Sequence, residues 1–301
     1  MSTKNNYDVI VIGGSYAGLS AALALGRASI STLVIDSGTP CNKPTPHSHN
    51  FLTQDGKTPS QISATAKDQV LKYPSIEFRE DLVSEMEKVG SDFYLKTNTQ
   101  KFTAKQVIFA TGIKDIMPNI DNFKACWGKS IIHCPYCHGY EFNNKATAIL
   151  GNSEYAYEFS KMILNWSKDL IILTNGPKEF SEDQLFFFKS QNIKIIEKKF
   201  NKIEQSNGQI DAVQFEDKSS LKLQAMYARL DFEQQSNLPA SLACKFTESG
   251  HIEVDMFQQT SVEGILACGD NNTPMRSVSN AVAQGTFAGV LASKNIINSR
   301  Y

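Results

Sequence analysis

Residues 7–18 read YDVIVIGGSYAG, and this stretch predicts the fold of the chain. It begins with a short, mostly β-branched run, which is typical of a buried parallel strand. Gly13, Gly14 and Gly18 follow, and they open an apolar stretch with helical character. A tight glycine turn at the start of a helix lets backbone N–H groups approach a pyrophosphate. Strand, turn and helix in this order therefore predict a dinucleotide-binding unit.

The residues after this turn support the same prediction. The segment Ser31 to Ile35 reads as a second strand and ends at Asp36, an acid placed to hold the ribose hydroxyls of an adenosine. Ser15 stands where the motif usually has its second glycine, and serine is the smallest replacement that still tolerates a close phosphate. The alternative is a tight β–α turn without a nucleotide, but the ordered set of elements favours binding.

Two later segments complete this first unit. Residues 107–112 (VIFATG) and 264–270 (GILACGD) each read as a strand that ends in a small-residue turn. The glycines permit close approach of the backbone, and Asp270 can accept hydrogen bonds from a polyol chain. The second segment leads into a long helical stretch whose N-terminus could face the carbonyl edge of a flavin. We therefore expect the first unit to be built from both ends of the chain.

A second unit of the same kind begins near residue 146. The strand ATAIL leads to the turn GNSEYA (151–156), a helical stretch and the strand DLIIL. This second strand ends in LTNG (173–176), which offers neither an acid for a free ribose nor an arginine for a 2′-phosphate. Two interpretations stay open here: a degraded nucleotide site, or a domain that kept its fold and lost its nucleotide.

These patterns predict an α/β fold with two Rossmann-like, three-layer nucleotide-binding domains, the second inserted into the first. The division places residues 1–114 and 246–301 in the first domain and residues 115–245 in the second. With 301 residues and 41% hydrophobic content, the chain is long enough to form two such cores.

The inserted domain carries a pair of cysteines, Cys134 and Cys137, in the segment HCPYCH. Such a pair can close into a small disulfide ring and reopen, and a sulfur at a helix N-terminus loses its proton more easily. A zinc knuckle would need two more ligands at similar spacing, and the remaining cysteines stand singly. C-x-x-C-H also permits covalent haem, but the polar start MSTKNNYD lacks the signal core that export requires. A redox dithiol without a metal is the favoured interpretation.

Charge and hydropathy argue against several other classes of protein. The net charge is −1, from 30 basic and 31 acidic residues, so no nucleic-acid partner is indicated. No uninterrupted apolar stretch is long enough to span a bilayer. Six cysteines in 301 residues do not make a disulfide scaffold, so we expect a reducing, cytoplasmic location with one working thiol pair.

With the first glycine turn, ATG, C-x-x-C, the second glycine turn and GD in this order, the chain resembles the low-molecular-weight thioredoxin reductases. Those pyridine nucleotide–disulfide oxidoreductases fold as an FAD domain interrupted by an NADPH domain, and they are homodimers. The resemblance runs over nearly the whole length. It implies that Asp270 contacts the ribityl–phosphate part of FAD, that Cys137 stacks near the flavin, and that Cys134 exchanges with the substrate.

The resemblance also implies the other cofactor contacts. Glycines of the first turn and Asp36 match contacts to the pyrophosphate and ribose of FAD. The residues that we expect to bind or surround the cofactor are Gly13, Gly14, Ser15, Ala17, Gly18, Asp36, Ser37, Cys41, Asn42, His49, Asn50, Ala110, Thr111, Gly112, Gly269, Asp270, Ser277 and Val278. Use of NADPH or NADH stays open, because residues 174–176 (TNG) replace the arginine pair that binds the 2′-phosphate in those reductases.

Several departures point to a subgroup. The reductases carry an aspartate after the second cysteine, whereas this chain has His138, which can also move a proton near neutral pH or simply lie at a surface turn. CPYCHGYE, SHNFLTQDG (48–56) and LTNG make the chain similar to the gliotoxin- and holomycin-type dithiol oxidases. In those enzymes a dithiol reduces the disulfide, electrons pass to FAD, and oxygen reoxidises the flavin to give hydrogen peroxide. By this resemblance His49 and Asn50 lie near the flavin and the substrate entrance, or they merely fill a loop.

The sequence thus predicts an FAD-dependent thiol–disulfide oxidoreductase of the thioredoxin reductase type. In this hypothesis Cys134 exchanges with the substrate, Cys137 is the flavin-side sulfur and His138 is the acid–base group. The substrate is a small dithiol or disulfide, or a thioredoxin-like protein. Two alternatives stay open: a dithiol oxidase that uses molecular oxygen, and a non-catalytic FAD-binding module that senses thiol redox state.

Overall fold

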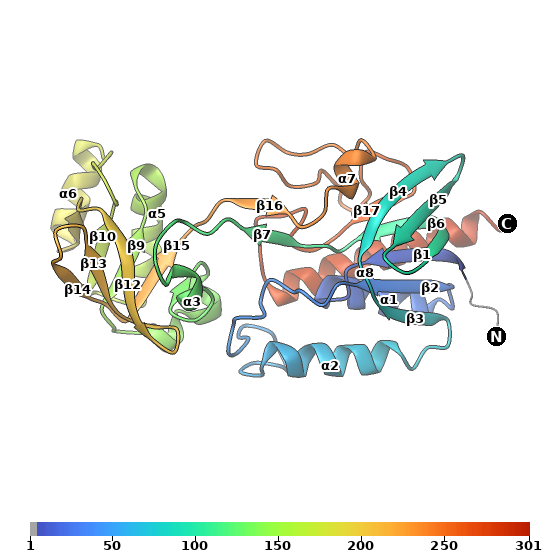
Figure 1. Ribbon diagram of the computed structural model, residues 1–301, viewed down its shortest axis with the longest axis horizontal. Helices are drawn as coiled ribbons and strands as arrows, with labels where there is room; N and C mark the ends of the chain where they lie inside the picture. The colour runs from blue at the N-terminus through green and yellow to red at the C-terminus, as the bar shows by residue number, and fades with distance from the viewer. Residues whose placement is uncertain (1–4) are drawn as a thin grey trace. The chain divides into compact units, whose positions relative to one another are not determined.

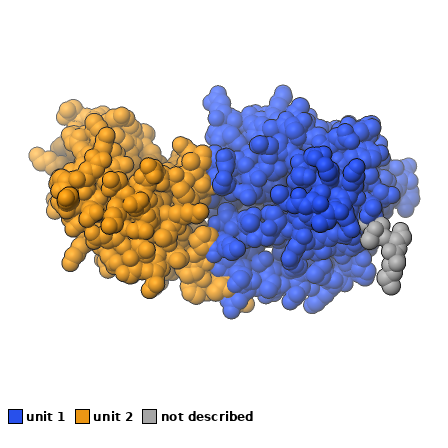
Figure 2. All heavy atoms as spheres, viewed as in Figure 1, with its two compact units in different colours: residues 1–43, 59–114, 232–301 blue, residues 44–58, 115–231 orange. Residues whose placement is uncertain are grey.

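The computed structural model describes residues 5–301, which form two compact units (Figure 2). Unit 1 consists of the chain up to residue 43, residues 59–114 and residues 232–301. Unit 2 consists of residues 44–58 and 115–231. Segments from both halves of the sequence therefore build unit 1, while unit 2 is largely one continuous insertion.

Unit 1 is built on a seven-stranded sheet (Figure 1). Its parallel part runs β3 (Ile76–Glu80), β2 (Thr32–Asp36), β1 (Asn6–Ile12), β6 (Lys101–Phe109) and β17 (Ile265–Ala267). The first half of β6 pairs on its other edge with an antiparallel hairpin of β5 (Asp92–Thr97) and β4 (Val83–Val89). Because β1 lies between β2 and β6, it is buried within the sheet, which explains its β-branched sequence.

Helices α1 (Tyr16–Arg27) and α8 (Val278–Asn298) pack closely against each other in unit 1. Gly285 and Gly289 of α8 face main-chain carbonyls of α1, where a Cβ would collide. The remaining helices of this unit are α2 (Pro59–Val70) and α7 (Leu238–Ser241). Within residues 5–301, no helix has both the length and the apolar character that a membrane span needs. The α1–α8 contact holds the glycine turn, since α1 starts directly after it.

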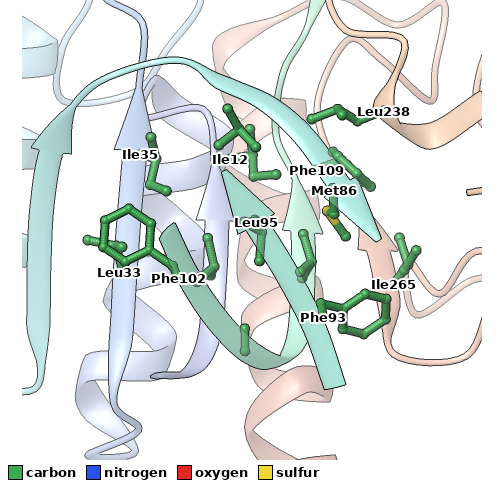
Figure 3. Packing of buried hydrophobic residues seen from close by; sticks show 14 of the residues in the cluster. Ile12, Leu33, Ile35, Met86, Phe93, Leu95, Phe102, Phe109, Leu238 and Ile265 are labelled. Carbon is green, nitrogen blue, oxygen red and sulfur yellow. The ribbon is translucent and has the colours of Figure 1, made fainter. Parts of the chain in front are cut away.

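The core of unit 1 lies between the parallel strands and the β4–β5 hairpin, as Figure 3 shows. Leu33 of β2, Phe109 of β6 and Phe93 of β5 are completely buried there. Leu238 of α7 and Ile252 also belong to this cluster. The hairpin therefore covers the face of the sheet with Phe93 and Leu95, every second residue of β5, and with Val83 and Met86 of β4, which lie on either side of a register shift.

Unit 2 is built on a five-stranded parallel sheet, in the order β11 (Lys194–Ile196), β10 (Leu170–Leu173), β9 (Thr147–Leu150), β15 (Ala225–Ala228) and β8 (Ile131–Ile132). Ile171 and Leu173 of β10 belong to one apolar cluster, and Leu170 and Ile172 to another. Since successive side chains of a strand point to opposite faces, both faces of this sheet are covered.

Different elements cover the two faces of the unit 2 sheet. One cluster includes residues of the helices α5 (Ser153–Ile163) and α6 (Glu182–Ser190). The other includes residues of the short helix α3 (Phe123–Cys126) and of an antiparallel sheet formed by β12 (Phe200–Ser206), β13 (Gln209–Phe215) and β14 (Ser220–Lys222). In unit 2 the helices, the parallel sheet and the antiparallel sheet therefore form three layers. The predicted class, an α/β fold of two three-layer units, is confirmed.

The division into units differs from the predicted boundaries at two places. The chain re-enters unit 1 at residue 232 rather than 246, because β16 (Phe232–Gln234) pairs with β7 (Ile113–Asp115) and because Leu238 and Cys244 belong to the unit 1 core. Residues 44–58, which were expected in the first domain, belong to unit 2. Their contacts within unit 2 explain this second difference and are described below.

Candidate active site

Cys134 and Cys137 are joined by a disulfide, with their Cα atoms 5.3 Å apart. Cys134 directly precedes the single-turn helix α4 (Pro135–His138), and proline suits its first position because it has no N–H to satisfy. The main-chain N–H groups of Cys137 and His138 both donate to the carbonyl of Cys134 at 3.2 Å. Both cysteines are partly exposed, so their disulfide is open to attack by a thiolate. No group of three His, Cys, Asp or Glu side chains in residues 5–301 is arranged to hold a metal ion.

His138 ends α4 and follows the second cysteine directly. Its Nε2 is buried and has no hydrogen-bond partner among residues 5–301. The main chain of His47 hydrogen-bonds to the ring, and because Nε2 is unpartnered we assign this bond to Nδ1. Burial lowers the pKa of His138, the Glu141 carboxylate opposes this shift, and His49 adds to it. A neutral ring that is held through Nδ1 leaves Nε2 as a proton acceptor, as a general base requires.

His49 and Asn50 belong to unit 2, not to unit 1 with the other residues that were expected to surround the flavin. They lie in residues 44–58, which we call the histidine loop. This loop folds back on itself, since the N–H of Gly56 donates to the carbonyl of Ser48 at 2.9 Å. Its side chains also contact the residues around α4. These contacts attach the loop to the inserted unit rather than to the first domain, and a position of both residues near the flavin stays a prediction.

Within the histidine loop, His49 contacts residues next to the disulfide. Its ring is perpendicular to that of His138, with the centroids 6.4 Å apart. Its Nε2 lies 3.4 Å from Oε1 of Glu141, and its Nδ1 lies 3.6 Å from Oδ2 of Asp55. The N–H of Asn50 donates to the same aspartate at 2.7 Å. The sequence argument missed Glu141, although it stands in the quoted CPYCHGYE segment, because its partner His49 is distant along the chain.

The glycine turn of unit 1 opens a cleft at the carboxyl ends of β1, β2 and β6, where sheets of this kind bind dinucleotides. Gly13 has a φ of 104°, and a Cβ there would meet the carbonyl of Ala110. At Gly18 a Cβ would collide with the carbonyl of Gly13, and at Gly14 it would lie 2.9 Å from Cβ of Asp36. The predicted residues that line the cleft are Gly13, Ser15, Asp36, Ser37, Ala110 and Thr111. This backbone cradle fits the pyrophosphate of FAD.

Asp270 follows β17, and its carboxylate lies near Cys41, another residue that was predicted to surround the cofactor. Its Oδ2 lies 3.7 Å from Sγ of Cys41 and 3.5 Å from Nε of Arg276. The preceding Gly269 has a φ of 88°, and a Cβ there would lie 3.0 Å from Cβ of Ala17 at the start of α1. The loop after β17 therefore lies against the first glycine turn. The sequence did not identify Arg276, which is the cation at this aspartate.

The last predicted residues occupy ends of elements in unit 1. Ser277 caps α8, because its Oγ accepts the N–H of Asn280 at 3.2 Å, and Val278 is the first residue of that helix. Asn42 donates through Nδ2 to the hydroxyl of Tyr16 at 3.1 Å. Gly112 follows β6 with a φ of 66°. These contacts are structural, and they leave the proposed roles of these residues toward FAD to experiment.

Asn271 is a candidate cofactor residue that the sequence argument missed, although it directly follows Asp270. Its side chain is completely buried, and Nδ2 donates to the carbonyl of Phe109 at 2.9 Å. Its Oδ1 is buried and has no hydrogen-bond partner among residues 5–301. A buried acceptor without a donor is unfavourable, so a donor on a bound cofactor would satisfy it. This acceptor is a second feature of unit 1 that fits FAD.

The second glycine turn, in contrast, is filled by side chains of unit 2 itself. A Cβ on Gly151 would lie 2.9 Å from the ring of Tyr155. The hydroxyl of Ser153 donates to Oε2 of Glu179 at 3.0 Å, and the N–H of Glu179 donates to the side chain of Asn152 at 2.9 Å. The start of a helix attracts an anion, and here the chain supplies one. The Glu179 carboxylate therefore lies next to the start of α5.

At the end of β10, polar side chains likewise bond to other residues of unit 2. The Asn175 side chain accepts the N–H of Phe200 at 2.9 Å. Nζ of Lys178, a nearby cation, pairs with the Glu197 carboxylate at 2.7 Å. Side chains that a nucleotide-binding turn would direct at a ribose or a phosphate are thus engaged within unit 2.

A C-x-x-C disulfide in one Rossmann-like unit and a glycine-lined dinucleotide cleft in the other define the class of flavin-dependent disulfide oxidoreductases. The chain belongs to the pyridine nucleotide-disulphide oxidoreductase family, which it matches over residues 7–285. The predicted enzyme class, with FAD as its cofactor, is thereby confirmed.

Individual relatives agree with this family. The chain is 32% identical to thioredoxin reductase tcpT of Claviceps purpurea, over 99% of this chain and 96% of the relative. It is 30% identical to thioredoxin reductase sirT of Leptosphaeria maculans, over 94% and 92% respectively. The solved structure of an oxidoreductase from Agrobacterium tumefaciens is 34% identical and superposes with a TM-score of 0.91, covering 97% of this chain and 99% of that one. The resemblance to thioredoxin reductases therefore extends over the whole fold.

Proposed function

We propose that this thioredoxin-reductase-like enzyme works as a dithiol oxidase. In this function a small dithiol supplies two electrons to the Cys134–Cys137 disulfide, and molecular oxygen is the final acceptor. The observation that supports it is the hydrogen bond from Ser153 to Glu179, which places a carboxylate at the second glycine turn. Nicotinamide then has no role as the electron donor.

The argument from Glu179 is electrostatic. A pyrophosphate at the start of α5 would lie beside this carboxylate, and two unit charges about 4 Å apart repel by roughly 1–4 kcal/mol near a protein surface. The nearby Lys178 does not offset the repulsion, because it already pairs with Glu197. The ring of Tyr155 on Gly151 adds a steric obstacle. Together these side chains disfavour NADH and NADPH.

In the proposed reaction His138 accepts the proton of one substrate thiol through Nε2. The resulting thiolate attacks Sγ of Cys134, the Cys134–Cys137 bond breaks, and Cys137 leaves as a thiolate. The second substrate thiol then attacks the mixed disulfide and releases Cys134. The substrate loses two electrons and two protons and leaves as a disulfide. The first glycine turn, Asp36 and Thr111 would hold FAD, which would supply the two-electron acceptor for the dithiol, with molecular oxygen as the final oxidant.

A second candidate function is the reduction of a thioredoxin-like protein or a disulfide by NADPH. It is favoured by the full-length match to relatives named thioredoxin reductase. In that case electrons would run in the opposite direction through the same two cysteines. The binding of nicotinamide separates the two functions.

The test uses the purified yellow protein under anaerobic conditions. Dithiothreitol should bleach the flavin, and admission of air should restore the colour with formation of hydrogen peroxide. NADPH and NADH should leave the spectrum unchanged. Prompt bleaching by NADPH would instead establish the reductase. The variant Cys134→Ser should keep its flavin and lose bleaching by the dithiol, whereas the matched variant Cys126→Ser, at a buried thiol of unit 2, should keep both.

We also propose that the enzyme is a cytoplasmic homodimer. Phe287, Val290 and Ile297 are exposed on one side of α8, an apolar stripe that a second copy would cover. Cys126, Cys244 and Cys268 are buried thiols outside any disulfide, which suits a reducing compartment. Light scattering on the parent and on Phe287→Asp tests the dimer: a monomeric parent would contradict it.

A further inference from the structure

The histidine loop brings a second imidazole to the redox centre of unit 2. We propose that His49 and Glu141 are positioning residues that set the protonation state of His138 during thiol–disulfide exchange. His49 opposes the imidazolium form of His138, and Glu141 favours it. The inference rests on the role of His138 as acid–base group in the proposed function, and it applies to either direction of electron flow.

The geometry places His49 beside both Glu141 and His138. Oε1 of Glu141 lies 3.4 Å from Nε2 of His49, and the ring of His49 lies edge-on to that of His138, with 6.4 Å between the centroids. Glu141 stands in the short helix η1 (Tyr140–Phe142), which follows α4 almost directly. Glu141 therefore interacts with both rings, and a positive charge on one ring disfavours a positive charge on the other.

Other groups around His138 do not change this assignment. From the histidine loop, His47 contributes its main chain to His138, and Asp55 faces His49 at 3.6 Å. From β15, the hydroxyl of Tyr227 lies 3.0 Å from where a Cβ on Gly139 would stand. Burial, with Glu141 adding to it, raises the pKa of Tyr227, so this tyrosine stays neutral. In the oxidised protein Cys134 and Cys137 are joined in the disulfide and carry no charge.

The arrangement also connects a buried base to water. Nε2 of His138 is buried, whereas the side chains of His49 and Glu141 are 23% and 40% exposed. When His138 takes the proton of a substrate thiol, the imidazolium forms close to Glu141, and the solvent-facing pair offers the proton a route outward. A charged His49 would hold Glu141 and weaken this stabilisation. The two residues thus act on His138 in opposite directions.

The test measures the titration of His138 directly, by NMR of protein with labelled histidine. His49→Gln removes a competing charge, so the pKa of His138 should rise by roughly one unit, while Glu141→Gln should lower it by a similar amount. The control Glu158→Gln removes an exposed carboxylate from α5 and should leave the titration unchanged.

Kinetics supply a second readout. The rate of anaerobic flavin bleaching by dithiothreitol should fall at low pH as His138 becomes protonated, and the midpoint of this fall should move upward in His49→Gln and downward in Glu141→Gln. Shifts in the same direction, or none in the NMR titration, would overturn the inference. If the NMR shifts occur but no dithiol ever bleaches the flavin, the inference stands and the proposed oxidase function fails.

Discussion

The two units share one plan, a β-strand, a glycine turn and a helix, and they differ in what occupies the turn. In unit 1 the turn at Gly13 opens a cleft that Asp36 lines. In unit 2 the ring of Tyr155 lies on Gly151, and the carboxylate of Glu179 bonds to the residue that begins the helix. The same backbone motif therefore lines a cleft in one unit and contacts side chains of its own unit in the other.

This difference shows that a glycine turn permits nucleotide binding but does not ensure it. The turn supplies N–H groups and a positive helix end in both units. Whether a phosphate can approach is decided by side chains that arrive from outside the motif. Glu179 is 26 residues from Ser153 in the chain, so the motif alone does not reveal the closure.

The largest expected effect comes from placing a methyl group in each turn. Gly13→Ala should lower the affinity for FAD by at least roughly tenfold, because its Cβ would meet the carbonyl of Ala110 in a backbone region that L-residues avoid. Gly151→Ala is the matched change in unit 2, and it should leave the retention of FAD unchanged because Gly151 does not line the unit 1 cleft. The ratio of flavin to protein absorbance after gel filtration measures both. Equal retention of FAD by the two variants would place the flavin outside the unit 1 cleft.

The next largest effect tests whether the Glu179 carboxylate weakens nucleotide binding at the second glycine turn. Glu179→Gln should strengthen the binding of NADPH by about tenfold at low ionic strength, since it removes a like-charge repulsion of roughly 1–2 kcal/mol. Quenching of protein fluorescence during a nucleotide titration measures the change. Glu182→Gln, at the first residue of α6, removes a carboxylate of unit 2 that does not bond to Ser153. A similar gain in this control would mean that net charge, rather than the carboxylate at the turn, excludes the nucleotide.

The smallest effect concerns acid stability near the open cleft. Hydrogen bonds from the side chains of Thr97 and Thr99 lower the pKa of Asp81 to about 2, and Asp81 lines the cleft of unit 1. The folded-state pKa lies below the unfolded value of 3.8, so the stabilisation is complete above that pH and is lost as the pH falls toward 2.

Asp81→Asn should remove this dependence. Near neutral pH the variant should unfold at a lower temperature than the parent. Its free energy of unfolding should be lower by about 1 kcal/mol or less, because the carboxylate is exposed. The difference should shrink as the pH falls below 3.8 and vanish only below the folded-state pKa of about 2. The counterpart in unit 2 is Asp217→Asn, which loses a 2.6 Å contact with Lys198. A gap between parent and Asp81→Asn that widens in acid would reverse the sign and refute the assignment.

Much of the fold could be predicted because its signals are local. The strand expected at Ser31 to Ile35 is observed as β2, shifted by one residue, and the buried runs of β9 and β10 lie where the sequence predicts. The helix after the second turn begins earlier than expected, at Ser153, because the side chain of Asn152 accepts the N–H of that residue and caps it. Glycine turns and β-branched runs depend on neighbours in the chain, so the sequence carries them.

The parts that could not be predicted depend on distant partners. The contact of His49 with Glu141 joins residues from two separate segments of unit 2, and no local pattern of the histidine loop indicates it. The return of the chain at residue 232 depends on the pairing of β16 with β7, two short strands that carry little sequence signal. Asn271 is recognisable only through burial, because its unpaired oxygen is a property of the packed core.

The carboxylate at the start of α5 has a consequence for how the protein responds to its surroundings. A bound nucleotide stabilises a fold by an amount that grows with the logarithm of its free concentration, and it dissociates when that concentration falls. Glu179 is tethered to the helix that it neutralises and cannot be diluted. Unit 2 should therefore keep its stability whatever the nicotinamide level of the cell, while unit 1 gains stability only as FAD becomes available.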